Sequence, residues 1–491
     1  MDETRDAPFA DGANTARRPD ASADRSRSAT PGSRDENRYP AAARPPLVGA
    51  PVHRLRAPRS PPGRPVRAPV PCPSIALKRS ISAQQFRFST PLAIAYFRRM
   101  DQADVIVIGA GVGGVTAAHA LGRRGMKVVL IEAKDPCAPC FKAEKMWPGN
   151  LEIFDKYGLK EAALSIATPI KSVSEAKAGR ILTRLDTGEF GMYYQDLVNA
   201  LRRKGFPETV EFRVARVSDV QRTPDLQKVV LQDGGVIEGR LVIFVPGGAS
   251  PMGQKLGLDR RVIREGQSTG FGFDVARADG SQFPFESLTY MSTGTHARMG
   301  YCTFFPIRDV MRANMFVFRS AKDEWVKRMI KEPHDTLLDA LPGLEKVLGP
   351  FTVPSKVETA GIDLWRIENA PDLDGMVVIG DAYQGVCPST GTGFDKVLGD
   401  VDVLCSNHIP NWFATPGMSR YKIASFYADP RKQHFDRYSM QKAHYERWAA
   451  TSPTWSASLH RTRLSAELYI SAFRKNKWLW ADRTYSPTMH M

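Results

Sequence analysis

Residues 103–132, ADVIVIGAGVGGVTAAHALGRRGMKVVLIE, combine three glycines and one acid at a spacing that suits phosphate and ribose chemistry. The segment predicts an apolar strand, a glycine turn, a helix of small residues and a second apolar strand. Gly109 permits the turn, Gly111 lets backbone approach a pyrophosphate, and Gly114 lets the helix pack closely on the strand. Glu132 ends the second strand, where its carboxylate can accept hydrogen bonds from a ribose diol. The pattern therefore predicts a dinucleotide-binding site.

A second glycine-rich segment follows much later, where residues 377–398 read VVIGDAYQGVCPSTGTGFDKVL. Asp381 ends an apolar strand, and its carboxylate can bind the hydroxyls of a ribityl chain. The loop before the next helix contains Pro388, Gly391, Thr392 and Gly393. Its amides, from residue 390 to residue 393, can stabilise negative charge on a reduced flavin ring. The first motif alone does not distinguish NAD binding from FAD binding, but two such glycine-rich motifs favour FAD.

Other reactive patterns carry less weight. Cys137 and Cys140 form a CxxC pair around Pro139, but no second ligand pair suits zinc, and the pair follows Glu132 in a loop rather than starting a helix. The sequence contains no HExxH motif, no P-loop and no Trp-x-Trp-x-Ile-Pro halogenase signature. We expect no metal site. We assign no catalytic residue, because flavin chemistry needs no amino-acid nucleophile.

The elements that position these motifs divide the chain into seven segments. Stretches such as QSTGFGFDVA and MRANMFVFRS alternate like sheet strands, whereas YYQDLVNALRRKG at 193–205 has helical periodicity. The predicted fold class is α/β: a Rossmann-like FAD-binding domain, an inserted, mostly antiparallel β-sheet substrate domain, C-terminal helices and a disordered N-terminal tail. The predicted ranges are a tail at 1–100, FAD-binding parts at 101–180, 193–260 and 371–430, a substrate-domain strand at 181–192, the substrate-domain sheet at 261–370, and a helical region at 431–491.

The first hundred residues account for most of the chain's basic character. Of the formal net charge of +16, residues 1–100 contribute +10 and the rest only +6. The tail is rich in Pro, Arg, Ala and Ser, so it cannot bury enough apolar surface to fold. A translation start at Met100 is favoured over a transit peptide or an RNA-binding arm, because Met100 directly precedes the first patterned segment. No nucleic-acid partner is expected, since no stacking aromatics alternate with the arginines.

Composition also bears on the compartment. Six cysteines are too few and too scattered for a disulfide scaffold, which favours a reducing, cytoplasmic environment. No uninterrupted apolar run reaches the ~18 residues of a bilayer span, so we expect no transmembrane helix. The basic, aromatic stretch after Pro430 leaves peripheral membrane association open, although helices packed on the FAD-binding domain are favoured.

The two glycine-rich motifs, with Glu132 and Gly380-Asp381, resemble those of FAD-dependent monooxygenases of the para-hydroxybenzoate hydroxylase type over residues 103–430. The segments FKAEKMWPGNLEIFDKYGL, FVFRSAKDEWV and NWFATPGM resemble a bacterial subgroup described as FAD-dependent oxidoreductases. The resemblance implies that the ADP half of FAD is held by Gly109, Gly111, Gly114 and Glu132, with Lys145 near the ribose and pyrophosphate. It implies that Asp381, Gly391 and Gly393 hold the ribityl and isoalloxazine half.

The chain departs from this family in the middle of the sequence, at LVIFVPGGASPMGQKLGL. Pro246-Gly247 stands in place of the family's Asp-Gly, Ser250 matches its Ser, and Gly253 replaces its Arg. The family motif is linked with both FAD and NADPH binding, so the change bears on the electron donor, NADPH or NADH. No second GxGxxG follows a strand, which argues against a permanent nicotinamide domain.

The resemblance implies a substrate site between the flavin and the predicted sheet. Candidate residues there are Tyr290, Tyr301 and Arg308, with Phe304, Met315 and His296 as weaker ones. The first functional hypothesis is a monooxygenase that uses NAD(P)H and molecular oxygen to hydroxylate or epoxidise a small organic substrate through a flavin C4a-hydroperoxide. The alternatives are a flavin-dependent reductase of carbon-carbon double bonds and an FAD-binding protein without turnover.

Overall fold

The computed structural model describes residues 101–481 except residue 249. The predicted disordered tail at 1–100 lies outside the described residues. Two sheets organise the described part of the chain, and each has its own apolar core.

The first sheet contains the nucleotide motif. Its central strands pair in parallel and are largely buried, as expected for a sheet covered on both faces. Its strand order is β6 (Val210–Val214), β2 (Val128–Glu132), β1 (Gln102–Ile108), β9 (Val236–Phe244), β8 (Gln227–Leu231) and β7 (Val217–Gln221), with β16 (Met376–Val378) also pairing with β9.

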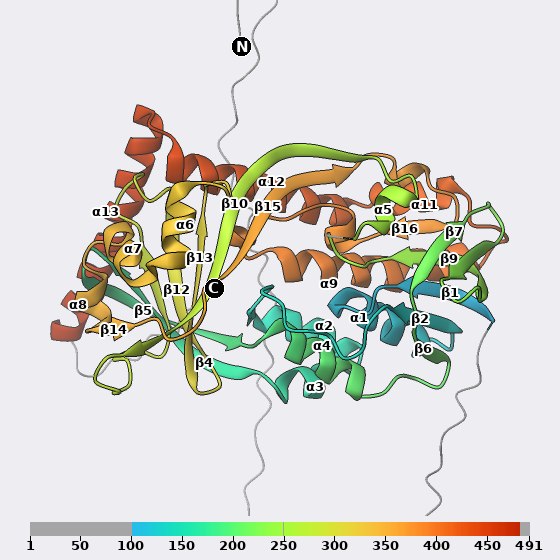
Figure 1. Ribbon diagram of the computed structural model, residues 1–491, viewed down its shortest axis with the longest axis horizontal. Helices are drawn as coiled ribbons and strands as arrows, with labels where there is room; N and C mark the ends of the chain where they lie inside the picture. The colour runs from blue at the N-terminus through green and yellow to red at the C-terminus, as the bar shows by residue number, and fades with distance from the viewer. Residues whose placement is uncertain (1–100, 249, 482–491) are drawn as a thin grey trace, which may run out of the picture. The chain divides into compact units, whose positions relative to one another are not determined.

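Helices from distant parts of the chain cover this sheet. α1 packs against α4 and α9, so the two predicted glycine-helix motifs are neighbours (Figure 1). The helices of this region are α1 (Val112–Gly122), α2 (Pro148–Lys156), α3 (Lys160–Leu164), α4 (Tyr194–Arg203), α5 (Met252–Lys255), α9 (Gly393–Val403), α10 (Ile409–Phe413) and α11 (Arg420–Tyr427). Short turns of other helix types are η1 (Ala370–Asp372), η2 (Gly380–Ala382), η3 (Pro388–Thr390) and η4 (Leu404–His408).

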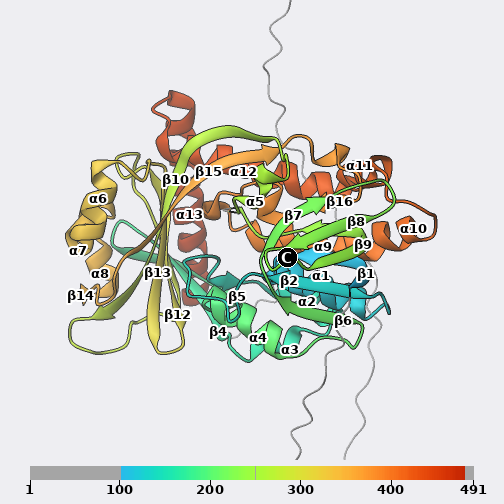
Figure 2. The ribbon, with the colours of Figure 1, turned by 45° about the vertical axis from the view of Figure 1, so that its right-hand side comes forward.

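The second sheet is mostly antiparallel. Its order is β14 (Phe351–Thr352), β10 (Arg260–Arg277), β13 (Val310–Val317), β12 (Met299–Ile307), β11 (Leu288–Met291), β4 (Thr168–Lys177), β5 (Arg180–Gly191) and β3 (Lys145–Met146), with β15 (Glu358–Ile367) also pairing with β10. Helices α6 (Glu324–Lys331), α7 (Pro333–Ala340) and α8 (Leu344–Leu348) lie along one side of this sheet (Figure 2). The core between these helices and the sheet buries Phe271, Phe273 and Phe304.

Two long C-terminal helices complete the described chain. α12 (Pro430–Thr451) contacts α9 of the first region and β12 of the second, and α13 (Trp455–Ala481) contacts β5. The long strands β10 and β15 pair with each other and run from the second sheet towards the first (Figure 1). Within residues 101–481, no helix combines the length and the apolar character that crossing a bilayer requires.

The predicted fold class is confirmed for the described residues, and one predicted boundary needs correction. The sequence places residues 101–180 in the FAD-binding domain, but β3 and β4 within this range belong to the second sheet. The reason is a tight hairpin: Ala178 and Gly179 both have positive φ, at 48° and 78°, which joins β4 directly to β5 in one sheet. Residues 168–177 therefore lie with the predicted substrate-domain strand.

Candidate functional site

The turn between β1 and α1 brings backbone close to backbone, as its glycines require. Gly109 has φ of +104°, and a Cβ there would lie 2.7 Å from the Pro246 Cα. A Cβ on Gly114 would lie 1.8 Å from the Gly109 carbonyl oxygen. Any side chain at Gly114 would therefore push α1 away from the strand. The turn directs the N-terminus of α1, with its partial positive charge, towards a cavity.

This cavity, the dinucleotide cavity, has a volume of about 370 Å³ and is lined by Gly111, Glu132, Asp381 and Gly393 among others. The Glu132 carboxylate accepts hydrogen bonds from the backbone N–H of Ala110 at 2.9 Å and of Ala133 at 2.8 Å. These bonds fix the carboxylate at the end of β2, and its remaining lone pairs can accept from hydroxyl groups. The predicted ribose acid and ribityl acid thus line one cavity.

Arg202 and Lys142 are two of the cations that line the cavity, and sequence reasoning missed both. Arg202 of α4 is buried, donates to the Ala110 carbonyl at 2.9 and 2.8 Å, and lies 3.4 Å from a Glu132 oxygen. Lys142 pairs with Asp381 at 3.0 Å, and the Asp381 charge raises the pKa of Lys142 above its ordinary value. Both keep positive charge where a pyrophosphate would lie. No local motif marks Arg202, since it reaches the cavity from a helix 70 residues after Glu132.

Lys145, which the resemblance placed near the ribose and pyrophosphate, lies elsewhere. It belongs to β3, which pairs with β5 in the second sheet. Its amine pairs with Glu189 and lies 5.3 Å from the centre of the Phe305 ring. Pairing of β3 with β5 holds the Lys145 side chain away from the cavity. Lys142, in the irregular segment before β3, lines the cavity instead.

A buried ion network supports the turn that carries Asp381. The Gly380 N–H donates to Asp400 at 2.9 Å, and Lys396 donates to the Gly380 carbonyl at 3.3 Å. Lys432 of α12 pairs with Asp400 at 3.1 Å, and all three charged side chains are buried. Burial alone would raise the pKa of Asp400, but Lys396 and Lys432 lower it below its ordinary value. Removing one partner of such a network costs about 3–5 kcal/mol.

The predicted flavin loop is held from two sides. Tyr301 of β12 donates to the Ser389 carbonyl at 2.6 Å, and Lys442 of α12 donates to the Thr390 carbonyl at 2.7 Å. Gly391 has φ of +67°, a conformation that favours glycine. The predicted site residues Pro388, Gly391 and Thr392 shape this loop, whereas Gly393 begins α9 and lines the dinucleotide cavity.

The altered middle motif also meets the dinucleotide cavity. Pro246 and Gly247, directly after β9, line it. Ser250 accepts a hydrogen bond from the Met252 N–H at 3.4 Å, and Gly253 lies in the short helix α5. The replacement of Asp-Gly by Pro-Gly therefore changes the chemistry of the cavity wall while leaving the strand intact.

A second cavity, of about 770 Å³, lies between the second sheet and helices α12 and α13, and we call it the sheet cavity. Its apolar lining includes Met291, Met299, Phe316, Phe318 and Leu468. Its polar lining includes Tyr301, Ser389, Glu446 and Arg461. Burial raises the pKa of Glu446 to about 6, although a hydrogen bond from Ser389 opposes this rise. A cavity of this size and lining is typical of small-molecule sites.

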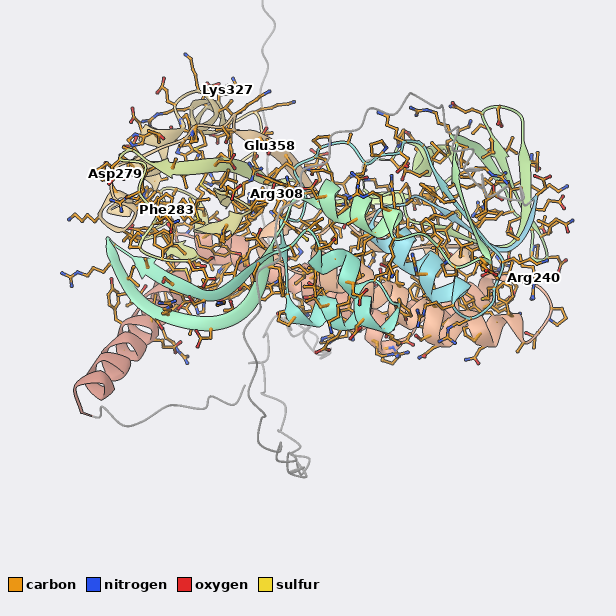
Figure 3. All side chains as sticks on the ribbon, turned by 90° about the horizontal axis from the view of Figure 1, so that it is seen from below. Arg240, Asp279, Phe283, Arg308, Lys327 and Glu358 are labelled. Carbon is orange, nitrogen blue, oxygen red and sulfur yellow. The ribbon has the colours of Figure 1, made fainter. Side chains whose placement is uncertain are left out.

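Of the candidate substrate residues, only Tyr301 lines this cavity. Tyr290 faces the opposite side of the sheet, where its hydroxyl donates to the Pro342 carbonyl at 2.6 Å. Arg308, labelled in Figure 3, lies exposed between β12 and β13 and pairs with Asp196 at 2.7 Å. Phe304 and Met315 belong to the core shared with α6–α8, and His296 does not line the cavity.

The donor set of the dinucleotide cavity fits FAD. Two carboxylates are available for the ribose and ribityl hydroxyls, and three cations, Lys134, Lys142 and Arg202, and two helix N-termini are available for negative charge. Val112, Phe394 and Val397 provide apolar wall. Among residues 101–481 other than 249, no group of histidines, cysteines and acids is arranged to hold a metal ion.

Comparison with known proteins agrees with this fit. Residues 102–407 match the model of a family described as FAD binding domain. The FAD-dependent monooxygenase ausM of Aspergillus calidoustus is 26% identical over 336 residues, which is 62% of this chain and 70% of the relative.

Solved structures show the same fold. The p-nitrophenol 4-monooxygenase PnpA from Pseudomonas putida matches with a TM-score of 0.59 and 15% identity, covering 78% of this chain and 98% of PnpA. HpxO of Klebsiella pneumoniae, complexed with FAD and uric acid, matches with a TM-score of 0.57 and 16% identity, covering 75% of this chain and 92% of HpxO. The predicted resemblance and the predicted class, an FAD-dependent oxidoreductase, are confirmed at the level of the family. The family model matches more than half of the chain, and the matched region contains both glycine motifs. The chain therefore belongs to the FAD binding domain family, and its relatives are FAD-dependent monooxygenases.

Proposed function

We propose that the protein hydroxylates or epoxidises a small organic substrate in the sheet cavity, with FAD in the dinucleotide cavity, molecular oxygen as co-substrate and NADPH or NADH as electron donor. One observation carries the proposal: a single loop borders both cavities, because Ser389 lines the sheet cavity and Gly393 lines the dinucleotide cavity. Oxygen transfer requires the reacting groups to be in contact. A flavin ring against this loop would meet a substrate in the sheet cavity.

The residues of the dinucleotide cavity bind and orient the cofactor in this proposal. When bound, FAD supplies the hydride-accepting and oxygen-activating chemistry. Glu132 would accept from the ribose hydroxyls, and Asp381 from the ribityl hydroxyls. Arg202 and Lys142 would offset the charge of the pyrophosphate, with the N-terminus of α1.

The residues of the sheet cavity position the substrate and limit water. Tyr301 and Lys442 hold the loop backbone from two sides, so its amides keep a fixed direction. Methionine and aromatic side chains dominate the apolar lining, which disfavours water beside the reacting atoms. Glu446 is the one carboxylate in this lining, and it can accept a hydrogen bond from a hydroxyl or amine of the substrate.

A paired substitution on α12 tests the proposal. Ala449 lines the sheet cavity, whereas Gln441 is exposed on the same helix and does not line it. A substrate is first found by screening organic compounds for oxygen-dependent consumption of NADPH. Ala449→Phe should retain FAD but lower product formation at least ~10-fold, because lost pocket volume removes about 1.4 kcal/mol or more of binding. The control Gln441→Phe should behave like the wild type.

Unchanged product formation in Ala449→Phe would contradict the assignment of the sheet cavity. A product that forms equally well without oxygen would instead favour a reductase of carbon-carbon double bonds. Bound FAD with no turnover of any donor would favour a binding protein.

A further inference from the structure

Residues 133–144, which link β2 to β3, form one wall of the dinucleotide cavity without being helix or strand. The segment is anchored at both ends. Asn199 of α4 accepts from the Cys137 N–H at 2.8 Å and donates to the Cys137 carbonyl at 3.1 Å. At the other end, the Glu144 carboxylate is buried and accepts from Arg312 twice at 2.9 Å.

Between these anchors, the segment reaches across the cavity. Cys137, Cys140 and Lys142 all line it, and Lys142 continues to Asp381. Any change that stiffens residues 137–142 therefore acts on the wall and on the position of Lys142.

The two cysteines lie three residues apart in the sequence, and both line the dinucleotide cavity. Interaction between their thiols lowers the pKa of Cys137 to about 7 and raises that of Cys140. The positive charges of Arg202 and Lys142 lower the Cys137 pKa further, whereas burial and Glu132 raise it. The other cysteines of the described residues, Cys302, Cys387 and Cys405, are buried. Among the cysteines of the described residues, the Cys137–Cys140 pair is therefore the most accessible to oxidants in solution.

We propose that Cys137 and Cys140 form a reversible disulfide that fixes the wall of the dinucleotide cavity and slows the release of FAD. This inference goes beyond the proposed function and rests only on FAD binding in that cavity. Such a disulfide would be a redox switch on cofactor retention. A thiol reductant would reverse it.

The chemistry balances with hydrogen peroxide as the oxidant. The Cys137 thiolate attacks one peroxide oxygen, the O–O bond breaks, and water leaves after protonation of the released hydroxide. The Cys137 sulfenic acid then loses its oxygen as a second water when the Cys140 thiolate attacks the sulfur. Two thiols and one peroxide thus give one disulfide and two waters. Two electrons move from sulfur to peroxide.

The expected effect follows from chain entropy. The disulfide closes a loop of four residues, from 137 to 140. In the chain-entropy model, closing so short a loop lowers the population of an open form of the wall by at most roughly 20-fold. We expect FAD release to slow by about tenfold on oxidation.

The test uses the purified FAD-loaded protein, treated with hydrogen peroxide and then with or without dithiothreitol. Peptide mass spectrometry should show a peptide containing residues 137–140 that has lost two hydrogen atoms, and dithiothreitol should restore them. FAD release after dilution, followed by flavin fluorescence, should slow after peroxide and recover after reduction. Cys137→Ser and Cys140→Ser should bind FAD but show no peroxide-dependent change.

Ala133→Ser provides a matched control, since Ala133 is exposed on the same segment, does not line the cavity, and its variant keeps both thiols. It should respond to peroxide like the wild type. Failure of the disulfide to form, or a disulfide that leaves FAD release unchanged, would overturn the inference. Both results would leave the proposed oxygenation untouched, because product formation is measured separately.

Discussion

The two cavities differ in how the chain builds them. The dinucleotide cavity is made of strand ends, helix starts and glycines, with ionised groups around it. The sheet cavity is made of side chains from β11, β12 and β13, the loop at Ser389 and helices α12 and α13, and it combines a methionine-rich and aromatic wall with hydroxyl-bearing side chains. One loop, residues 388–393, separates the two.

This difference follows from the chemistry of the two ligands that the cavities suit. A phosphate and a ribose need backbone amides and carboxylates at defined places, which a few glycines and acids provide locally. An organic substrate needs a shaped apolar volume, which arises only when distant elements pack. We therefore expect substitutions in the two cavities to have separable effects on cofactor content and on turnover.

The largest effect is expected at Asp381. Asp381→Ala removes charge-assisted hydrogen bonds worth about 1.5–3 kcal/mol each, so the FAD content of the purified protein should fall sharply. Absorbance of oxidised flavin per protein chain measures this. The control Asp372→Ala removes an exposed acid outside the cavity lining and should keep its FAD. Full FAD retention in Asp381→Ala would remove this residue from the cofactor site.

A smaller effect is expected at Glu446, where the sheet cavity buries a carboxylate. Its pKa of about 6 in the folded protein lies above the ordinary 4.5. The folded state therefore binds more protons than the unfolded chain between these values, and the free energy of unfolding falls as pH rises through them. The loss at pH 7 is about 2 kcal/mol.

Glu446→Gln should therefore be more stable than the wild type at pH 7, with a gap that narrows towards pH 4.5. Urea unfolding across this range measures the gap. Glu446→Asp, which keeps a carboxyl group, should retain pH dependence. A difference in the free energy of unfolding that does not change with pH would show that the Glu446 carboxylate is well solvated and that burial does not raise its pKa.

A still smaller effect concerns the electron donor. The resemblance places Gly253 at the arginine of the family's middle motif, and Lys255 lacks the bidentate fork that makes arginine a strong phosphate partner. We expect NADPH and NADH to differ by less than about tenfold, or 1.4 kcal/mol, in the rate of flavin reduction. Stopped-flow reduction with each donor decides this. A preference for NADPH above about a hundredfold would contradict it.

The smallest effect is expected from the tail. A chain that begins at Met100 should keep its FAD content and its thermal midpoint, because a segment of this composition can contribute little packed core. Flavin absorbance and a thermal scan measure the FAD content and the thermal midpoint of the full-length and the shortened chain. A large drop in either quantity would assign the tail a structural role.

The sequence predicts more of the dinucleotide cavity than of the sheet cavity, and the reason is physical. Glu132 and Asp381 were found because each directly follows an apolar strand beside a glycine turn. Arg202 was missed because its place depends on how α4 packs. Tyr290 and Tyr301 are both sheet residues, but Tyr290 lies opposite Cys302 in the register and so faces the helices.

The central claim is that the loop at residues 388–393 joins a cofactor cavity to a substrate cavity. Its most direct test reduces the FAD-loaded protein without oxygen, adds a substrate from the screen, and mixes with heavy-isotope oxygen gas. We predict a product with one heavy oxygen atom in the wild type and little in Ala449→Phe, although both reoxidise their flavin. Reoxidation without heavy oxygen in any product, or equal labelling in the two proteins, would contradict the account.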